Sequence, residues 1–111
     1  MPILLKDQGI KKVLVPGIEA RLIHLKSLMT LVSEIKLGVQ EAPLPYHTHD
    51  AEQTTYILEG KLKVFIEGEK PCEIGPGDLY YVASGVPHTI RSLSPVVRVV
   101  ESFSPPRREF I

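Results

Sequence analysis

The chain has 111 residues, 43% hydrophobic and 23% charged, which is long enough and apolar enough for one globular domain. Thirteen basic and thirteen acidic side chains give a net charge of zero, which argues against a broad nucleic-acid-binding or anionic-membrane-binding surface. Cys72 is the sole cysteine, which excludes an intrachain disulfide. Because there is no leader pattern and no membrane-length apolar run, we expect a cytoplasmic protein with no nucleic-acid or membrane partner.

Short segments rich in β-branched and aromatic residues alternate with turn signals along the chain. Ten prolines and eight glycines separate these segments at intervals of about 8–12 residues, which is typical of an all-β sandwich or barrel. The predicted strands are 28–38, 54–60, 61–68, 78–83, 88–92 and 96–103. No segment has a convincing helical period, and residues 10–15 are too few to decide.

Two histidines and a Glu-Gln pair lie within seven positions, from His47 to Gln53. Alternate residues of a strand share a face, so if His47 and His49 point inward, Gln53 points inward and Glu52 outward. A bulge after Asp50 would reverse this assignment. Imidazoles at i and i+2 can take adjacent positions around Zn, Cu, Fe or Ni, so a metal site is indicated, with Gln53 favoured over Glu52.

A further ligand would have to come from elsewhere in the fold. The candidate is His88, which opens a predicted strand after a Gly-Val-Pro turn. His24, by contrast, has no partner signal and is interpreted as a structural or surface residue.

The stretches 38–60 and 77–92 resemble the two motifs of the cupin superfamily. The first motif is His-x-His, three or four residues, Glu or Gln, six residues and Gly, and 47–60 fits it. The second is Gly-Asp, a short strand, a Pro-x-Gly turn and a histidine, and 77–88 fits it except that Ala83 stands where Pro is usual.

This resemblance implies an all-β double-stranded β-helix, the jelly-roll barrel of cupins. It implies one cupin domain over 1–111 with a core at about 20–104, while the N-terminal arm and C-terminal tail pack on the barrel or on a partner. It also implies one divalent transition metal, which would be Mn, Fe, Ni or Zn. The implied ligands are His47, His49, Gln53 and His88.

A neutral ligand set has a chemical consequence. Three imidazoles and an amide leave the full charge on a divalent ion, which makes it a stronger Lewis acid than a Glu ligand would. An octahedral ion would keep two open positions for a chelating hydroxy-acid, diketone or enediol.

The C-terminal strand presents a carboxylate to the same cavity. Every second residue from Val97 to Phe103 shares a face, which is predicted to be the barrel interior and includes Glu101. Desolvation would raise the pKa of Glu101 and the cation would oppose that shift, so Glu101 is a candidate general acid or base. The alternative is a structural, salt-bridged carboxylate. Pro105 and Pro106 must end the strand.

The tail Phe-Ser-Pro-Pro-Arg resembles that of small cupins that linearise unsaturated uronates. By this resemblance Glu101 is the catalytic acid or base, Phe103 a cavity wall, and Arg107 a contact for the substrate carboxylate. The departure is Glu101 itself, where the shorter Asp is expected. Arg107 has the alternative of a surface or interface charge. Four tyrosines could offer hydroxyls to the pocket or simply pack: Tyr46, Tyr56, Tyr80 and Tyr81.

The leading functional hypothesis is a metal-dependent isomerase or lyase acting on a small, sugar-acid-like hydroxy-carbonyl acid. The alternatives are an Fe or Mn dioxygenase acting on a diketone or enediol, and a non-enzymatic cupin that binds a small ligand. Single-domain cupins resemble one another in forming homodimers through edge strands and N-terminal segments. The strand predicted at 28–38 is apolar enough to serve as such an edge.

Overall fold

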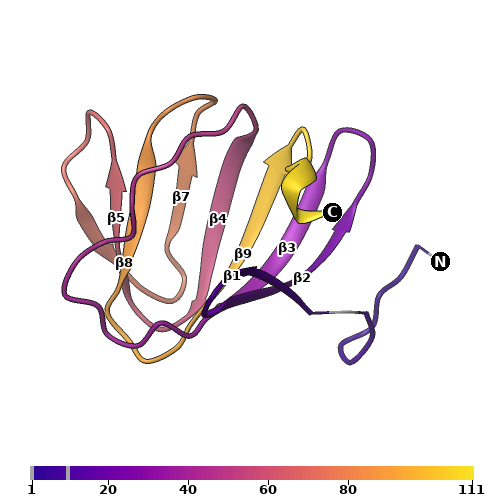
Figure 1. Ribbon diagram of the computed structural model, residues 1–111, viewed down its shortest axis with the longest axis horizontal. Helices are drawn as coiled ribbons and strands as arrows, with labels where there is room; N and C mark the ends of the chain where they lie inside the picture. The colour runs from indigo at the N-terminus through magenta and orange to yellow at the C-terminus, as the bar shows by residue number, and fades with distance from the viewer. Residues whose placement is uncertain (1, 10) are drawn as a thin grey trace.

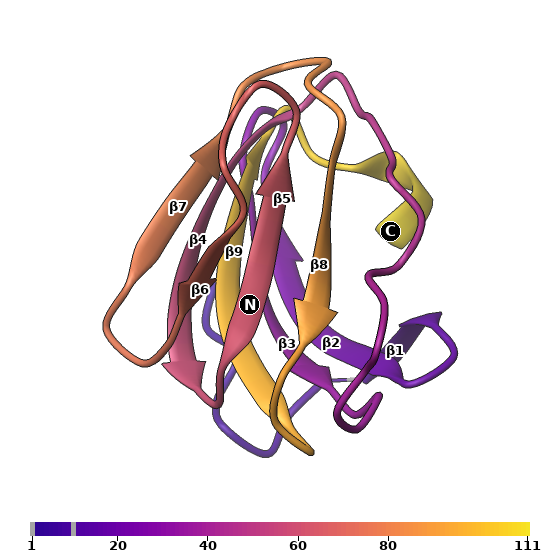
Figure 2. The ribbon, with the colours of Figure 1, turned by 90° about the vertical axis from the view of Figure 1, so that its left-hand side faces the viewer.

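The computed structural model describes residues 2–9 and 11–111, and over these residues it forms two facing antiparallel sheets. The larger sheet has the order β1-β2-β3-β9-β4-β7 (Figure 1), and the smaller one has the order β6-β5-β8 (Figure 2). The elements are β1 (Lys12–Val15), β2 (Ile18–His24), β3 (Met29–Ile35), β4 (Glu52–Glu59), β5 (Leu62–Ile66), β6 (Cys72–Ile74), β7 (Leu79–Val82), β8 (His88–Ser92), β9 (Val97–Ser104) and a 3-10 turn (Arg108–Phe110). The predicted jelly-roll class is confirmed.

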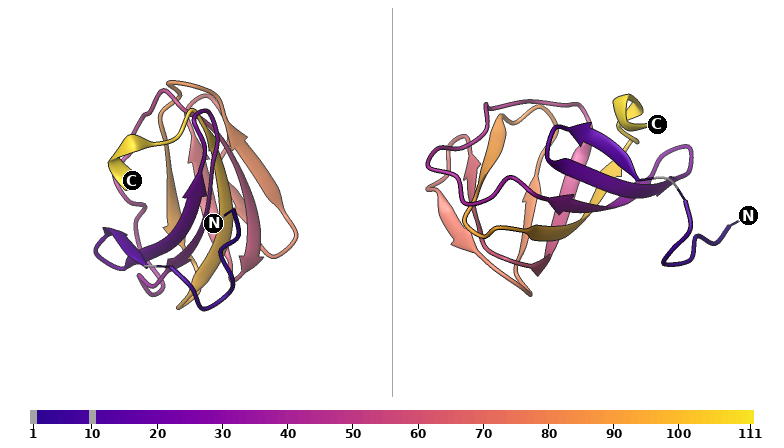
Figure 3. Two further views of the ribbon diagram at one scale, coloured as in Figure 1. Left: turned by 90° about the vertical axis from the view of Figure 1, so that its right-hand side faces the viewer. Right: turned by 60° about the horizontal axis from the view of Figure 1, so that its bottom comes forward.

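The ends of the chain extend beyond these sheets. Figure 3 shows the N-terminal segment leading away from the strands and the C-terminal turn beside them. The side chain of Arg21 on β2 ties the N-terminal segment down, because its Nε donates to the carbonyl of Gln8 at 3.0 Å. Among the described residues, no helix is long and apolar enough to cross a membrane.

Strand β3 corrects the prediction of an edge strand at 28–38. It pairs along its whole length with β2 on one side and β9 on the other, so Leu31 lies between Leu22 and Glu101. Its alternate residues are buried, because one face of the larger sheet packs on the interior. The outer strands of the larger sheet are β1 and β7.

The chain before β4 is not the continuous strand that the parity argument assumed. His47 forms an isolated bridge to His88, the chain bends at Asp50 and Ala51, and β4 begins at Glu52. Alternation nevertheless holds from the bend onward, because Gln53 is buried and Glu52 is exposed. The predicted orientation of Gln53 is therefore confirmed.

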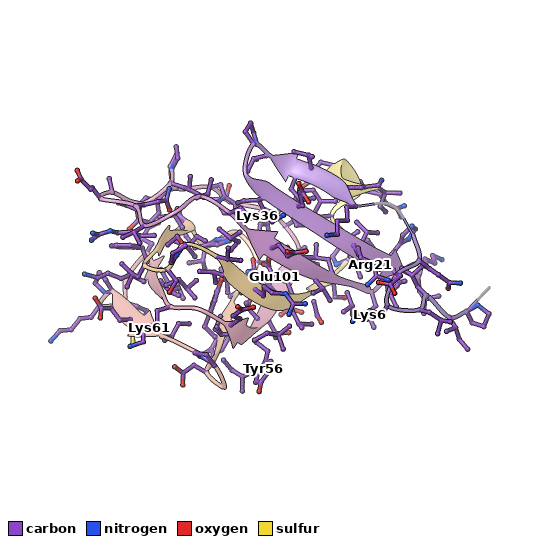
Figure 4. All side chains as sticks on the ribbon, turned by 90° about the horizontal axis from the view of Figure 1, so that it is seen from below. Lys6, Arg21, Lys36, Tyr56, Lys61 and Glu101 are labelled. Atoms are coloured by element: carbon purple, nitrogen blue, oxygen red, sulfur yellow. The ribbon has the colours of Figure 1, made fainter. Side chains whose placement is uncertain are left out.

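The core consists of two apolar clusters joined by β9. Val97 and Val99 belong to a cluster between the sheets, whereas Phe103 belongs to a second cluster with Met29. Glu101 occupies the interior position between them on the same face of β9. It lies within the body of the molecule, while Lys61 and Tyr56 point outward (Figure 4). Figure 2 shows the smaller sheet facing the larger one across this interior.

Candidate metal centre and cavity

Three histidines from the two predicted motifs meet at one end of the interior, where His88 is buried, His49 is half-buried and His47 is exposed. The main chains of His47 and His88 exchange two hydrogen bonds of 3.1 Å, which brings their ring centroids to 4.2 Å. The ring of His49 lies 4.8 Å from that of His88. Potential ligand atoms of all three lie within 4.8 Å of one another, so these histidines could hold a metal ion.

The ring orientation of His88 is set by its own turn. Its Nδ1 lies 2.8 Å from the carbonyl oxygen of Val86, and a carbonyl can only accept, so Nδ1 carries the proton. The lone pair of a neutral ring is then on Nε2, which is buried and has no hydrogen-bond partner among the described residues. A metal ligand has this arrangement, because its second nitrogen is held by a carbonyl.

His49 and Gln53 place two hydrogen-bond acceptors against each other. Nδ1 of His49 donates to the carbonyl of Ala51 at 2.8 Å, so its Nε2 is also a lone pair. That Nε2 lies 3.1 Å from Oε1 of Gln53, which is likewise an acceptor. Two acceptors at this distance repel unless a proton or a cation lies between them. Two ligands bonded at right angles to one ion at about 2.1 Å would be about 3 Å apart, so a shared cation fits.

The amide orientation of Gln53 follows from its other contacts. Its Nε2 donates to Oγ1 of Thr55 at 3.0 Å and to Oε2 of Glu101 at 2.8 Å. With both amide protons used, Oε1 must face His49. Thr55 and Glu101 thus act on the candidate centre through Gln53, and the role of Thr55 was not predicted. The alternation that places Gln53 inward also places Thr55 inward, which was the available signal.

Burial shifts the charge state of several groups here. Burial raises the pKa of Glu101 to about 7, and the charge of Arg107 opposes that shift. Burial lowers the pKa of His47 to about 4, and the neighbouring charges of His88, Arg107 and His49 lower it further. Burial lowers the pKa of His88 as well. Neutral imidazoles are the form that binds metals, so His47 and His88 are in that form at neutral pH.

The C-terminal tail packs against the candidate centre. Phe103 is buried, and its ring lies edge-on to that of His49 at 5.6 Å. The guanidinium of Arg107 stacks over Phe110 at 4.2 Å and over Phe103 at 5.3 Å. Its Nε donates to Glu109 at 2.7 Å. The contributions of Phe110 and Glu109 were not predicted, because no pattern in the tail indicates how it folds back.

A cavity of about 600 Å³ opens beside these residues. Each predicted site residue except His49 lines it, and His49 contacts the lining through Gln53 and Phe103. Tyr80 lines it as well, and burial followed by the charge of Glu101 raises the pKa of its phenol. Tyr46, Tyr56 and Tyr81 are exposed and do not line it. His24 is exposed, as expected.

The fold and the two histidine motifs define a cupin. Residues 33–100 match the model of the cupin domain, so the chain belongs to the cupin family.

Particular relatives narrow the comparison. The structure of KdgF from Halomonas sp. is similar over 97% of this chain and 98% of its own, with a TM-score of 0.84 and 26% identity. The pectin degradation protein KdgF of Dickeya dadantii is 35% identical over 66 residues, which are 59% of this chain and 59% of that protein. The dimethylsulfoniopropionate lyase DddQ of Ruegeria pomeroyi is 42% identical over 48 residues, which are 43% of this chain and 24% of that protein. The chain thus spans less than two thirds of the length of both curated relatives.

Proposed function

We propose that this cupin is a metal-dependent enzyme of the isomerase or lyase type that acts on a small, sugar-acid-like hydroxy-carbonyl acid. The main support is the pair of facing acceptors, His49 Nε2 and Gln53 Oε1. The amide nitrogen of Gln53 is bonded in turn to the half-buried carboxyl of Glu101. A candidate cation site and a titratable group would therefore be joined by one side chain at the wall of one cavity.

The proposed ligands are His47, His49, Gln53 and His88. This set suits a divalent Mn, Fe, Ni or Zn ion. Such an ion would supply Lewis-acid polarisation of a bound carbonyl or hydroxyl. Because the four ligands are neutral, they would leave its charge available for that purpose.

The other roles follow from position. Glu101 would take a proton from the atom next to the polarised group and return it elsewhere on the same molecule, so an isomerisation needs no co-substrate. Arg107, whose Nε is engaged by Glu109, would use the remaining donors of its guanidinium for the substrate carboxylate. Phe103 would form the wall against which the substrate rests.

The relatives support this class of reaction. One is named for pectin degradation, and another is named as a lyase. The test is to load purified protein with Mn, Fe, Ni or Zn and to assay ring opening or tautomerisation of an unsaturated uronate and of other hydroxy-carbonyl acids. Turnover that depends on the metal is expected. Oxygen uptake with the iron form would instead favour the dioxygenase, and metal and ligand binding without turnover would favour a binding protein.

We also propose that the protein is a homodimer. Strands β1 and β7 are the outer strands of the larger sheet, and no strand of residues 2–9 and 11–111 pairs with their outer edges. The side chains of Leu79 and Tyr81 on β7 are 70% and 75% exposed. Sedimentation at micromolar concentration should give twice the 12.4 kDa of one chain. A mass of 12.4 kDa would contradict the proposal.

A further inference from the structure

The polar groups of the cavity are gathered at one end. The candidate ligands and Glu101 lie around Gln53, and Arg107 lies over the neighbouring ring of Phe103. Tyr80 stands at the boundary, because its side chain packs against the apolar cluster while its phenol lies near Glu101 and Gln53. Of the two threonines in the lining, Thr89 is already engaged, because its Oγ1 donates to the carbonyl of Leu44 at 2.7 Å. Thr48 lies next to His47 and belongs to the same end.

The rest of the lining is apolar and comes from both sheets. Five of these residues lie on strands that face one another, namely Ile18, Ile35, Leu62, Ile90 and Val99, and further apolar side chains of the lining come from the segments 14–16 and 44–45 and from Phe103 and Phe110. All five belong to one apolar cluster, so they form a continuous surface. Their main-chain groups lie in strands β2, β3, β5, β8 and β9 and pair within the ladders.

We infer that the ligand of this cavity has an apolar body, aliphatic or aryl, attached to the polar head that the candidate metal centre receives. For its head group the inference rests on the proposed function; for the body it rests on the lining alone. It narrows the substrate from sugar-like acids in general to acids with few hydroxyls beyond the head.

The physical reason is the cost of unpaired hydroxyls. A hydroxyl buried against the five apolar residues loses its bonds to water and gains none, whereas an apolar group of the same size is favoured there. Sites without polar partners discriminate in this way between otherwise similar ligands.

The size of the cavity supports the same conclusion. About 600 Å³ lies within the usual range for small-molecule sites, and a three-carbon acid would leave most of it empty. A body that reaches from the candidate centre to Ile18 and Ile90 would fill it.

The first experiment is calorimetry of the zinc-loaded protein with pyruvate, 2-oxobutanoate, 4-methyl-2-oxopentanoate, phenylpyruvate and 2-oxogluconate. These share a head group and differ in the body. Affinity should rise about fourfold for each added methylene until the cavity is filled. Phenylpyruvate should bind at least about tenfold more tightly than 2-oxogluconate.

Two variants test where the body lies. Ile18→Thr and Ile90→Thr should each lower the affinity for phenylpyruvate about tenfold and change the affinity for pyruvate little. The reason is that each substitution replaces part of the apolar wall with a hydroxyl. Ile23→Thr is the matched control on the same strand as Ile18, since Ile23 is 56% exposed and outside the cavity. This control substitution should leave the affinities for the whole series of acids unchanged.

A second measurement uses the metal-free protein with benzyl alcohol and glycerol as neutral probes. Benzyl alcohol should bind saturably and glycerol should not, and Ile18→Thr should weaken the binding of benzyl alcohol. If no acid binds but benzyl alcohol does, the proposed function fails at the head group and the apolar site stands.

Other results overturn the inference. If the acids bind with no dependence on chain length, or 2-oxogluconate binds as tightly as phenylpyruvate, the apolar body is wrong while the proposed function survives. If the metal-free protein also fails to prefer benzyl alcohol, the cavity does not select apolar groups at all.

Discussion

At the scale of single residues, the side chain of Gln53 links the parts of the candidate site. Its oxygen faces His49, and its nitrogen is bonded to Thr55 and Glu101. A Glu at this position could not donate to both oxygens, and its charge would lie beside that of Glu101. The amide therefore suits both the neutral ligand set and its neighbours.

Replacing Glu101 by Gln separates its chemistry from its position. The amide oxygen of the new side chain can still accept from Gln53, but it cannot exchange a proton with a substrate. We expect metal content to be unchanged and kcat to fall about 100-fold or more, the usual contribution of a general acid or base. Metal analysis and steady-state kinetics on the same preparation would check this. Unchanged turnover would remove Glu101 from the mechanism.

Removing His88 tests the metal centre itself. Its Nε2 is buried without a partner among residues 2–9 and 11–111, so His88→Ala should lower zinc affinity at least about 100-fold, more than the loss of an outer contact would. Competition with a chelator of known affinity measures this. His24→Ala is the control, because His24 is exposed and outside the cavity. Equal affinities for the two variants would refute the assignment.

The residues that the sequence predicted here share one property. His47, His49, Gln53 and His88 stand in short motifs whose spacing is itself the chemical signal. The apolar wall and the Arg107–Glu109 pair have no such signal, because they depend on how distant strands and the tail close on one another.

At the scale of the elements, the long strands with strong β-forming residues were predictable and the weaker ones were not. Strands β3, β4, β5, β7, β8 and β9 fall within a few residues of their predicted positions. Strand β6 has only three residues, and β2 contains Glu19, Arg21 and His24 among its seven. Such strands are held by their neighbours in the sheet rather than by their own composition.

The turn between β4 and β5 offers a test at this scale. Gly60 has a φ of +79°, and a Cβ there would overlap the carbonyl oxygen of Val96. Gly68 has a similar φ of +87°, but nothing described lies within 4 Å of its Cβ position. Gly68→Ala should therefore cost about 1 kcal/mol of unfolding free energy from backbone strain, and Gly60→Ala distinctly more from strain plus the clash. Urea unfolding of both variants compares them, and equal losses would show that the contact with Val96 is unimportant.

At the scale of the whole molecule, the jelly roll explains why residues far apart in the chain form one site. The pairing of β9 with both β3 and β4 places Glu101 opposite Leu31 and Thr55, and the bridge from His47 to His88 joins the two motifs. A carboxyl group is thereby held at the wall of the interior cavity, largely removed from water. The stability of the whole fold must therefore depend on its ionisation.

The pH dependence of the metal-free protein tests this coupling. The pKa of Glu101 is raised from 4.5 in the unfolded chain to about 7 in the fold, so the folded state holds the proton more tightly. The stabilisation is fully present below pH 4.5 and is lost as the pH rises through 7. Glu101→Gln has no such proton, so the unfolding free energy of the wild type minus that of the variant should fall by up to about 3 kcal/mol from pH 4.5 to 8.

The contribution of His47 has the opposite sign. Its pKa is lowered to about 4, so that stabilisation is present above pH 6.5 and is lost as the pH falls through 4. It is common to both proteins and cancels in the difference. Chemical unfolding in chelator-containing buffers across this range measures the difference, and a flat result would mean that Glu101 is solvated rather than enclosed.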